Sequence, residues 1–392
     1  MADIHYLDKP LETEALLERL CPPVRNWFKD TFPDFTRPQK LAIPAIIDQE
    51  HLLLCSPTGS GKTLTAFLTI IDQLVRRALD GKLDKKVYCV YISPIKALAN
   101  DIQRNLLGPL KEISERYLPD RAQEIKVGLR TGDTPQSERQ KMLRNPPHIL
   151  ITTPESLAIA ITSPRFQPIV SEVEYMIIDE LHSLVPTKRG VHLALTLSYL
   201  DTLLTRPVQR IGISATMEPL ETVAEFLVAS DDQESRSAAT KVCIAKVSGS
   251  RELDLDILIT DPKFSDLSVM KIFDKNIEAI ADFIAAHNTT IVFANTRKMT
   301  ENIVLKLRPY LGELVAGHHG SMDKKIRLDV EKKLKHGHLR AVVTSSSLEM
   351  GIDIGSVDLV LQIGSPGDIA TALQRIGRAG HHVGGIPRAR FL

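Results

Sequence analysis

The sequence predicts an α/β protein with two parallel β-sheets in tandem, and three observations support this prediction. Short apolar runs rich in Ile and Val alternate with longer amphipathic runs, the pattern of a parallel sheet with helices on both faces. This alternation stops at a polar stretch of small residues, 230–240, and then starts again. The length of 392 residues is too great for one ordinary domain and suits two.

The expected strands are short and apolar on both faces, as a buried parallel sheet requires. In the first unit we expect strands at residues 51–56, 87–93, 124–130, 148–153, 173–180 and 208–214. In the second unit we expect strands at 290–295, 339–345 and 357–364, and helices at 296–311, 322–336 and 368–376. We therefore predict one domain over residues 1–240 and another over residues 241–392. The final run, IPRARFL, is typical of an opening strand, so we expect this chain to be part of a longer protein.

The bulk composition indicates a soluble, globular protein. Apolar residues make up 43% and charged residues 25% of the chain. The net charge is only +1, so nucleic-acid binding would depend on local basic patches and backbone amides. The four cysteines are scattered without a C-x-x-C pair, which predicts reduced thiols. We find no secretory signal and no apolar run of about 18 residues, and we expect a cytoplasmic protein that binds no membrane.

A glycine-rich loop, SPTGSGKT at residues 56–63, follows the first predicted strand of this series and opens a helix. Glycines let backbone N–H groups curl around phosphate oxygens, and the helix N-terminus adds a favourable partial charge. We expect Lys62 to reach the β- and γ-phosphates of ATP and the Thr63 hydroxyl to bind Mg²⁺. Ser56 stands where the general pattern has a glycine. The other residues expected to bind the nucleotide here are Thr58, Gly59, Ser60 and Gly61.

Two carboxylates end another apolar strand, in the run MIIDELH at residues 176–182. A carboxylate at the carboxyl end of a neighbouring strand can hold Mg²⁺ opposite the phosphate loop, and we assign this role to Asp179. Glu180 is placed to orient or deprotonate the attacking water. His182 is a candidate for coupling this site to the second unit. An acidic pair after a strand is by itself more often a helix N-cap, but the phosphate loop upstream favours the metal site.

These two motifs together resemble those of superfamily 2 helicases, and further matches follow in the order of that family. The run TRPQ at residues 36–39 resembles the adenine-reading Q motif, which implies that Gln39 contacts the base. The run SAT resembles motif III, which makes Ser214 and Thr216 candidate relays between ATP and the strand. The run SSSLEMGIDIG contains Gly351 and Asp353 and resembles motif V, which places Asp353 at the ribose.

A narrower resemblance is to the Lhr-type (large helicase-related) proteins. It rests on KRGVHL at residues 188–193 after the acidic box, and on HHGSMDKKIRLDVEKKLK, SSSLEMGIDIG and LVLQIGSP. The resemblance implies two RecA-like domains of the P-loop NTPase fold, with ATP between them and a single strand across their top. It also implies a monomer that moves 3′-to-5′ along single-stranded DNA, unwinds DNA or RNA–DNA duplexes and serves DNA repair.

Two arginines occur in the run QRIGRAGH at residues 374–381, which resembles motif VI of the same helicases. Phosphoryl transfer places negative charge on the γ-phosphate oxygens, and cationic groups from a second domain can stabilise it. Arg375 and Arg378 lie three residues apart, on one face if the run is helical. We expect Arg378 to be the arginine finger, with Arg375 as the second candidate. The alternative is a basic surface turn.

Candidate nucleic-acid contacts follow strand ends in both units. Thr and Ser hydroxyls and helix N-termini suit phosphate oxygens and read no base sequence. Each motif alone is as often a helix cap, but repetition along one edge of both sheets favours a track for the nucleic-acid backbone. The expected contacts are Lys96, Arg130, Thr131, Gly132, Thr153 and Pro154 in the first unit and Thr296, Arg297, His319, Thr344 and Ser345 in the second.

Three functions stay open on these observations. The first is a DNA-directed helicase or translocase, the second is an RNA helicase in RNA processing, and the third is a nucleotide-gated clamp that separates no strands. No residue pattern that would read the 2′-OH of RNA is visible. Four histidines, at 318, 319, 381 and 382, come without cysteines or a spaced set of carboxylates, so we expect no metal site there.

Overall fold

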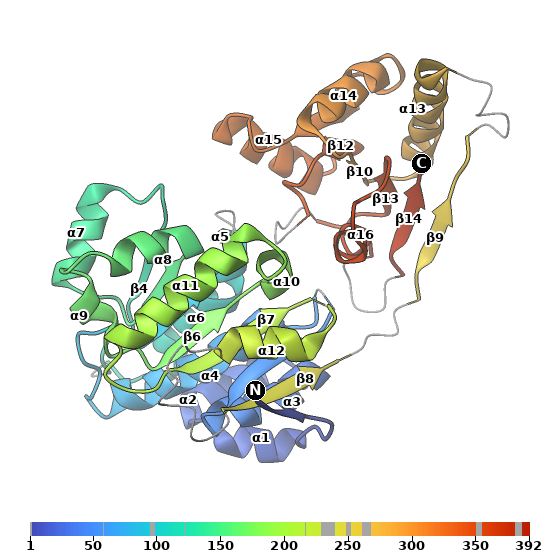
Figure 1. Cartoon of the computed structure of the whole chain (residues 1–392). Helices are drawn as coiled ribbons and strands as arrows, with labels where there is room; N and C mark the ends of the chain where they lie inside the picture. Colours follow the sequence, from blue (N-terminus) through green and yellow to red (C-terminus); the bar gives the residue numbers. More distant parts are fainter. Residues whose placement is uncertain are drawn as a thin grey trace. The chain divides into compact units, whose positions relative to one another are not determined.

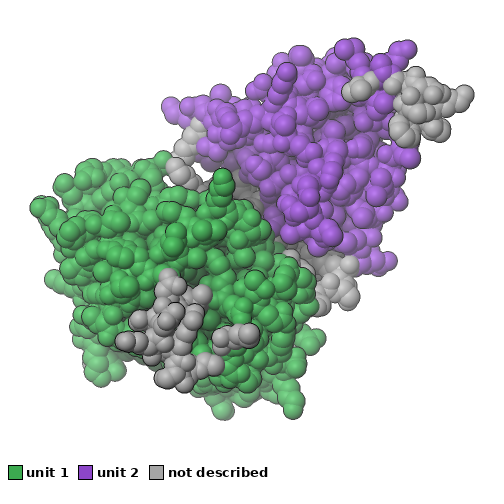
Figure 2. Space-filling model, viewed as in Figure 1, with its two compact units in different colours: residues 1–249 green, residues 250–392 purple. Residues whose placement is uncertain are grey.

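The computed structural model describes residues 2–57, 59–94, 99–120, 122–215, 217–228, 240–247, 252–260, 268–349, 355–380 and 386–392. The chain divides into two compact units, Met1–Gly249 and Ser250–Leu392 (Figure 2). Each unit holds its own parallel sheet, as Figure 1 shows. The predicted fold class is therefore confirmed.

The first unit contains an eight-stranded sheet in the order β1-β8-β2-β7-β6-β3-β5-β4, with every neighbouring pair parallel. All six strands predicted for this unit are present. The strands are β1 (Asp3–Tyr6), β2 (His51–Cys55), β3 (Cys89–Ile92), β4 (Val127–Arg130), β5 (Ile149–Thr152), β6 (Tyr175–Ile178), β7 (Gln209–Ser214) and β8 (Lys241–Lys246).

Helices cover both faces of this sheet and form two separate cores. Side chains alternate along β2, so that Leu52 and Leu54 enter one core while Leu53 and Cys55 enter the other. The first core is covered by α1 (Thr13–Arg19), α2 (Pro22–Thr31), α3 (Arg37–Ile47), α4 (Lys62–Leu79), α5 (Ala99–Ile102), the π-helix η1 (Gln103–Leu107) and α6 (Gly108–Tyr117). The second is covered by α8 (Pro154–Ile161), α9 (Gln167–Val170), α10 (Leu181–Leu184), α11 (Lys188–Leu203) and α12 (Leu220–Val228) (Figure 1). Helix α7 (Gln136–Arg144) follows the edge strand β4.

The boundary between the units differs from the predicted one. The prediction placed residues 241–246 in the second domain, but these residues form β8 and pair with both β1 and β2 of the first sheet. The units divide between Gly249 and Ser250. A strand that joins its sheet from far along the chain leaves no local mark of the sheet to which it belongs, which is why the composition shift at 230–240 misplaced the boundary.

The second unit contains a six-stranded sheet in the order β11-β12-β10-β13-β14-β9, again parallel throughout. Its strands are β9 (Asp254–Ile257), β10 (Thr290–Phe293), β11 (Val315–His318), β12 (Ala341–Thr344), β13 (Leu359–Gln362) and β14 (Arg388–Phe391). Its helices are α13 (Val269–Ala286), α14 (Arg297–Leu311), the 3-10 helix η4 (Gly312–Leu314), α15 (Lys324–Lys335) and α16 (Ile369–Ile376). The predicted strands and helices of this unit are confirmed, and the run IPRARFL does form a strand.

Parallel pairing brings functional loops together. The carboxyl ends of β2, β3, β6 and β7 meet at one edge of the first sheet, and those of β10, β12 and β13 meet at one edge of the second. Ligands of open parallel sheets bind at the carboxyl ends of strands. Within the described residues, no helix is both long and apolar enough to cross a bilayer.

His51, at the start of β2, should make the stability of the first unit depend on pH. Its Nδ1 accepts a hydrogen bond of 3.0 Å from the Arg210 backbone N–H. Burial and the charge of Arg210 lower the pKa of His51 to about 4. Because histidine in the unfolded chain titrates near 6.5, the folded state binds fewer protons between these two values. The contribution of His51 is therefore complete above pH ~6.5 and is lost as the pH falls toward 4.

We expect acidification across this window to reduce the free energy of unfolding by roughly 3 kcal/mol at most through His51. In His51→Asn an amide oxygen can accept the same hydrogen bond without titrating, so the variant should lose less stability on acidification. Urea unfolding at several pH values measures the difference, with exposed His5→Asn as the control. Equal pH dependence in the wild type and His51→Asn would contradict the prediction.

Candidate functional site

The predicted phosphate loop connects β2 to the N-terminus of α4. Gly59 and Gly61 have φ values of +76° and +86°, in the left-handed region that suits glycine. A Cβ added at Gly61 would lie 3.2 Å from Nε2 of Gln39. The backbone conformation at Gly61 therefore favours glycine, and the Gln39 side chain leaves little room for a larger residue. Thr58 lies outside the described residues.

Lys62 folds back over this loop. Its Nζ donates hydrogen bonds of 2.6 Å and 2.7 Å to the carbonyl oxygens of Ser56 and Pro57. Burial lowers the pKa of Lys62, and the nearby charges of Glu180 and Asp179 oppose this shift. The ammonium group thus lies at the loop and within the field of the acidic pair, as a phosphate-binding lysine requires.

The Q motif supports the same loop from the start of α3. Thr36 Oγ1 donates to the Ser60 carbonyl oxygen at 3.0 Å, and the Thr36 backbone N–H donates to Gln39 Oε1 at 2.8 Å. Thr36 and Gln39 form the capping box of α3, and Gln39 is buried. The contact between Gln39 and the base stays a prediction, because what the structure shows is a helix cap tied to the phosphate loop.

Asp179 ends β6 in a buried position close to this loop. Tyr91 Oη donates to Asp179 Oδ2, and the Glu180 backbone N–H donates to Oδ1 at 2.7 Å. Burial and the neighbouring charge of Glu180 raise the pKa of Asp179 to about 7. A buried carboxylate held in this way suits a cation, which would relieve the cost of keeping the charge out of water.

Asp101 is a further carboxylate near Asp179 that no sequence motif revealed. It lies on α5, after the carboxyl end of β3, and Asn105 Nδ2 donates to its Oδ1 at 2.7 Å. Burial and the charge of Asp179 raise its pKa to about 6, while a hydrogen bond with Thr63 acts in the opposite direction. The oxygen-only donor set of Thr63, Asp101 and Asp179 fits Mg²⁺, which prefers carboxylates and hydroxyls.

Glu180 occupies a strained backbone position. Its φ of +55° lies in the left-handed region, which non-glycine residues seldom adopt, and it caps the N-terminus of α10. Its side chain remains about one-quarter exposed, at 25%. Such strain persists where the surrounding structure enforces it and is concentrated at functional sites.

His182 connects this acidic pair to motif III. Its Nδ1 accepts a hydrogen bond of 3.0 Å from the Ala215 backbone N–H, and Ser214 Oγ lies 3.3 Å from the same nitrogen. Because Nδ1 is an acceptor, the proton of the neutral ring is on Nε2, which lies 3.3 Å from Glu180 Oε2. The structure thus brings together Glu180, His182 and Ser214; Thr216 lies outside the described residues.

Arg375, on α16 of the second unit, donates hydrogen bonds to residues of the same unit. Nε and Nη2 both donate to Glu349 Oε1, the first at 2.8 Å. Nη1 donates to Gln362 Oε1 at 2.7 Å and to Asn295 Oδ1 at 3.4 Å. The guanidinium carbon also lies 5.1 Å from the centre of the Phe293 ring. Four of the five N–H groups of an arginine are therefore engaged here.

Arg378 follows α16 in a turn and is also buried. Its backbone N–H donates to the Arg375 carbonyl oxygen at 3.0 Å. The alternative of a basic surface turn is therefore wrong for both arginines. Gly351 and Asp353 of motif V lie outside the described residues.

Loss of the Glu349 carboxylate should strongly destabilise the second unit. Both partners of the Arg375–Glu349 pair are largely buried, with side chains 7% and 15% exposed. Removal of one partner from a buried ion pair typically costs about 3–5 kcal/mol because the other charge remains buried and unpaired. We expect Glu349→Ala to lose that much free energy of unfolding in urea titrations. The Lys306–Asp274 pair of the same unit is about half exposed, so Asp274→Ala should cost less than about 1 kcal/mol. Similar losses in both variants would contradict this expectation.

The first-unit residues predicted to contact nucleic acid are mostly helix caps and braced loops. Thr153 is buried and its Oγ1 accepts from the Ser156 backbone N–H at 3.3 Å, at the start of α8, where Pro154 follows. Thr131 is also buried, and its backbone N–H donates to Thr134 Oγ1 at 2.8 Å. Gly132 is exposed, and Arg130 lies over the Phe166 ring. Lys96 lies outside the described residues.

The run KRGVHL, at the start of α11, braces this edge. Arg189 Nε donates to Glu155 Oε1 at 2.6 Å and its Nη2 donates to the Pro94 carbonyl oxygen at 2.8 Å. Arg189 thereby ties the segment after β3 to the start of α8. A Cβ on Gly190, in the first turn of α11, would lie 2.3 Å from the Leu184 carbonyl oxygen, so the close approach of α11 to the end of α10 requires glycine.

The second-unit residues of the predicted track differ in their exposure. Thr296 and Arg297 are exposed, with Thr296 Oγ1 accepting from the Met299 backbone N–H at 3.1 Å, and Ser345 is half-buried. Thr344 is fully buried, and its hydroxyl lies 3.1 Å from Ser347 Oγ. His319 is buried too, with Nε2 3.1 Å from Glu301 Oε1. This burial is at odds with direct contact by Thr344 and His319, which instead shape their loops.

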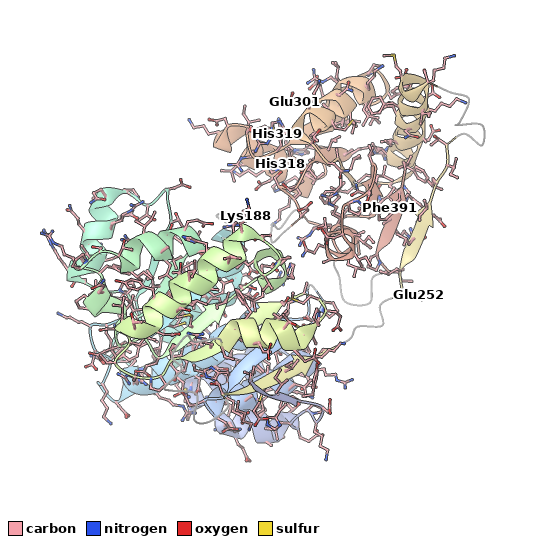
Figure 3. All side chains as sticks on the ribbon, in the orientation of Figure 1. Lys188, Glu252, Glu301, His318, His319 and Phe391 are labelled. Atoms are coloured by element: carbon pink, nitrogen blue, oxygen red, sulfur yellow. The ribbon has the colours of Figure 1, made fainter. Side chains whose placement is uncertain are left out.

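The neighbouring histidine, His318, has Nε2 3.0 Å from Glu331 Oε1 and Nδ1 2.7 Å from Ser347 Oγ. Figure 3 shows His318, His319 and Glu301 within the same part of the second unit. A carboxylate thus lies beside each of the two histidines, which the sequence spacing did not reveal.

A phosphate loop and an acidic box on parallel strands, followed by a second parallel-sheet unit, define the motor of a superfamily 2 helicase. Residues 36–226 match the DEAD/DEAH box helicase family, and residues 275–382 match the helicase conserved C-terminal domain. The chain is 43% identical over 385 residues to the ATP-dependent helicase Lhr-Core of Methanocaldococcus jannaschii, covering 98% of this chain and 44% of that protein. The Lhr-Core of Methanothermobacter thermautotrophicus is 47% identical over 370 residues, covering 93% and 42%.

A solved structure agrees with these relatives. The helicase Lhr of Mycobacterium smegmatis, bound to ssDNA and AMP-PNP, superposes with a TM-score of 0.82 at 42% identity, covering 96% of this chain and 48% of that one. The chain therefore belongs to the Lhr-type superfamily 2 helicases, with two RecA-like domains. It spans less than half the length of these relatives.

Proposed function

We propose that this chain is an ATP-driven motor that moves 3′-to-5′ along single-stranded DNA and unwinds DNA or RNA–DNA duplexes in DNA repair. The observation that carries the proposal is the link from Lys62 and the acidic pair through His182 to motif III. The effect of the acidic pair on Lys62 and the contacts of His182 support a phosphate site, a candidate base and a relay at one sheet edge. A binding module would need only the first of these.

The residues of the first unit have distinct roles in this proposal. The phosphate loop and Lys62 bind the β- and γ-phosphates of ATP. Thr63 and Asp179 would hold Mg²⁺, with Asp101 beside them, and the bound ion would neutralise charge on the phosphate oxygens. Glu180 accepts the proton of the attacking water on its carboxylate. His182 lies between that carboxylate and Ser214, and it couples the position of Glu180 to motif III.

The two arginines of motif VI, in the second unit, have different roles in this proposal. Arg375 is bound to Glu349, Gln362 and Asn295, so we assign to it the task of holding motif VI in place. We assign to Arg378, the second arginine of motif VI, the role of the arginine finger that stabilises charge on the γ-phosphate. Binding of ATP would draw the two domains together through this arginine, and hydrolysis would weaken that attraction.

DNA is the preferred strand in this proposal because the Mycobacterium smegmatis relative is bound to ssDNA. The four cysteines are free and buried, which fits a reducing cytoplasm, and we propose that the chain acts as a monomer. The test measures ATP hydrolysis by this chain alone, with single-stranded DNA and with single-stranded RNA. Stronger stimulation by RNA would favour an RNA helicase.

A second measurement separates a motor from a clamp. Strand displacement from a duplex with a 3′ single-stranded tail should require ATP, and a 5′-tailed duplex is the control for polarity. Stimulated hydrolysis without strand release from either duplex would favour the nucleotide-gated clamp. Light scattering of the same preparation tests the monomeric state.

A further inference from the structure

A small basic cavity lies beside the edge strand β4 of the first unit, away from the phosphate loop residues. Its volume is about 130 Å³, and its lining includes Arg130, Gln136, Arg139, Gln140, Ser163 and Phe166. No Asp or Glu lines it. Three of these residues lie on one face of α7, the helix that follows β4 (Figure 1).

Among the described residues, neither arginine of this cavity, both of them half-buried, is paired with a carboxylate. The guanidinium carbon of Arg130 lies 4.7 Å from the centre of the Phe166 ring. Within the part of the chain that the structure describes, no hydrogen bond or ion pair involves its side chain. Burial and the like charge of Arg139 lower the pKa of Arg130. An anion in the cavity would relieve this repulsion.

Arg139 connects the cavity to the predicted nucleic-acid edge. Its Nε donates to the Thr134 carbonyl oxygen at 2.9 Å. Its Nη2 donates to the carbonyl oxygens of Thr131 and Gly132 at 3.1 Å and 3.0 Å. In the described residues Nη1 has no hydrogen-bond acceptor, so its two N–H groups remain for a ligand. Arg139 therefore holds the loop that follows β4 and still presents donors beside Arg130.

We propose that the cavity formed by Arg130 and Arg139 binds one backbone phosphate of the nucleic-acid strand. This inference rests on the proposed function and adds Arg139 and the polar face of α7 to the nucleic-acid site. Arginine matches phosphate because its planar fork donates two parallel N–H bonds to two oxygens. The volume is several times the roughly 30 Å³ of a water molecule in the liquid, which leaves room for a phosphate group. Phe166 is buried and its ring contacts the Arg130 guanidinium. The Phe166 ring is therefore not exposed for stacking against a base.

Salt dependence of binding tests this proposal directly. The affinity of the whole chain for a fluorescent single-stranded oligothymidylate is measured by anisotropy over a series of KCl concentrations. Loss of one phosphate contact should reduce the slope of log affinity against log salt by about 0.7 for a single strand. We expect this reduction, and about tenfold weaker binding at low salt, for Arg130→Gln and for Arg139→Gln.

Arg144→Gln is the matched control, because Arg144 is exposed on the same helix and lies outside the cavity. Its slope should stay close to that of the wild type. Arg139→Gln also removes three bonds to carbonyl oxygens, so melting temperatures are measured alongside. If that variant unfolds, Arg130→Gln decides the result, since Arg130 has only a ring contact to lose.

Equal slopes for Arg130→Gln, Arg144→Gln and the wild type would overturn the proposal. Inorganic phosphate provides a second arm. If it raises the melting temperature of the wild type but not of Arg130→Gln, while the oligonucleotide slopes are equal, the cavity takes a free anion and the proposal fails. A wild-type chain that binds no oligonucleotide at all would instead refute the proposed function, so the two failures can be told apart.

Discussion

The Arg378→Ala variant should bind ATP as the wild type does and hydrolyse it about 10³–10⁵ times more slowly, the range found for arginine fingers. The reason is that Arg378 is the proposed arginine finger, whose charge would stabilise the γ-phosphate oxygens as the bond to the leaving group breaks. Steady-state kinetics with saturating single-stranded DNA gives kcat, and fluorescent-nucleotide titration gives the affinity.

Two further variants control this experiment. Arg308→Ala removes an exposed arginine of the same unit and should leave kcat unchanged. Arg375→Ala should lower kcat together with the free energy of unfolding, because it breaks the buried pair with Glu349. An unchanged kcat in Arg378→Ala would transfer the finger role to Arg375.

Glu180→Gln should lower kcat by about 10²–10⁴-fold, the usual contribution of a general base, and leave ATP binding intact. Glutamine keeps the shape of the side chain and the distance to His182 but cannot accept a proton. The control is Glu138→Gln, an exposed glutamate of α7 in the same unit. Retained hydrolysis in Glu180→Gln would remove the base assignment.

The backbone at Glu180 allows a sharper version of this experiment. Asparagine tolerates the left-handed region better than glutamate or glutamine. Glu180→Asn should therefore lose hydrolysis as Glu180→Gln does and gain about 1 kcal/mol in the free energy of unfolding. A variant that loses kcat but gains free energy of unfolding would show that the strained backbone at Glu180 is kept for catalysis and not for stability.

The sequence was sufficient for features that depend on local pattern. The phosphate loop and the acidic box are each an unbroken run of residues, so their residue types alone indicate the chemistry of the site. Buried strands such as β3 and β6 were visible because every side chain in them is apolar and enclosed. By contrast β1 and β9 are edge strands with mostly exposed side chains, so no apolar run marks them.

Features that depend on tertiary neighbours were not predictable in this way. Asp101 belongs to the candidate metal site only because the segment after β3 returns to Thr63 beside Asp179. The contacts of Arg375 with Glu349 and Gln362 join residues that are separate in the sequence, so motif VI alone did not reveal them. The hydroxyl of Thr344 resembled a surface contact in the sequence, but it is enclosed.

The place of β8 has a mechanical consequence. The chain leaves β8 toward the second unit directly beside β2, the strand that ends in the phosphate loop, and the Val247 backbone N–H donates to the Cys55 carbonyl oxygen at 2.8 Å. Tension along the segment that connects the units would thus act on β8, next to β2, rather than on a strand at the far edge of the sheet. Under the proposed function, a pull between the units would act first on the strand that leads into the phosphate loop.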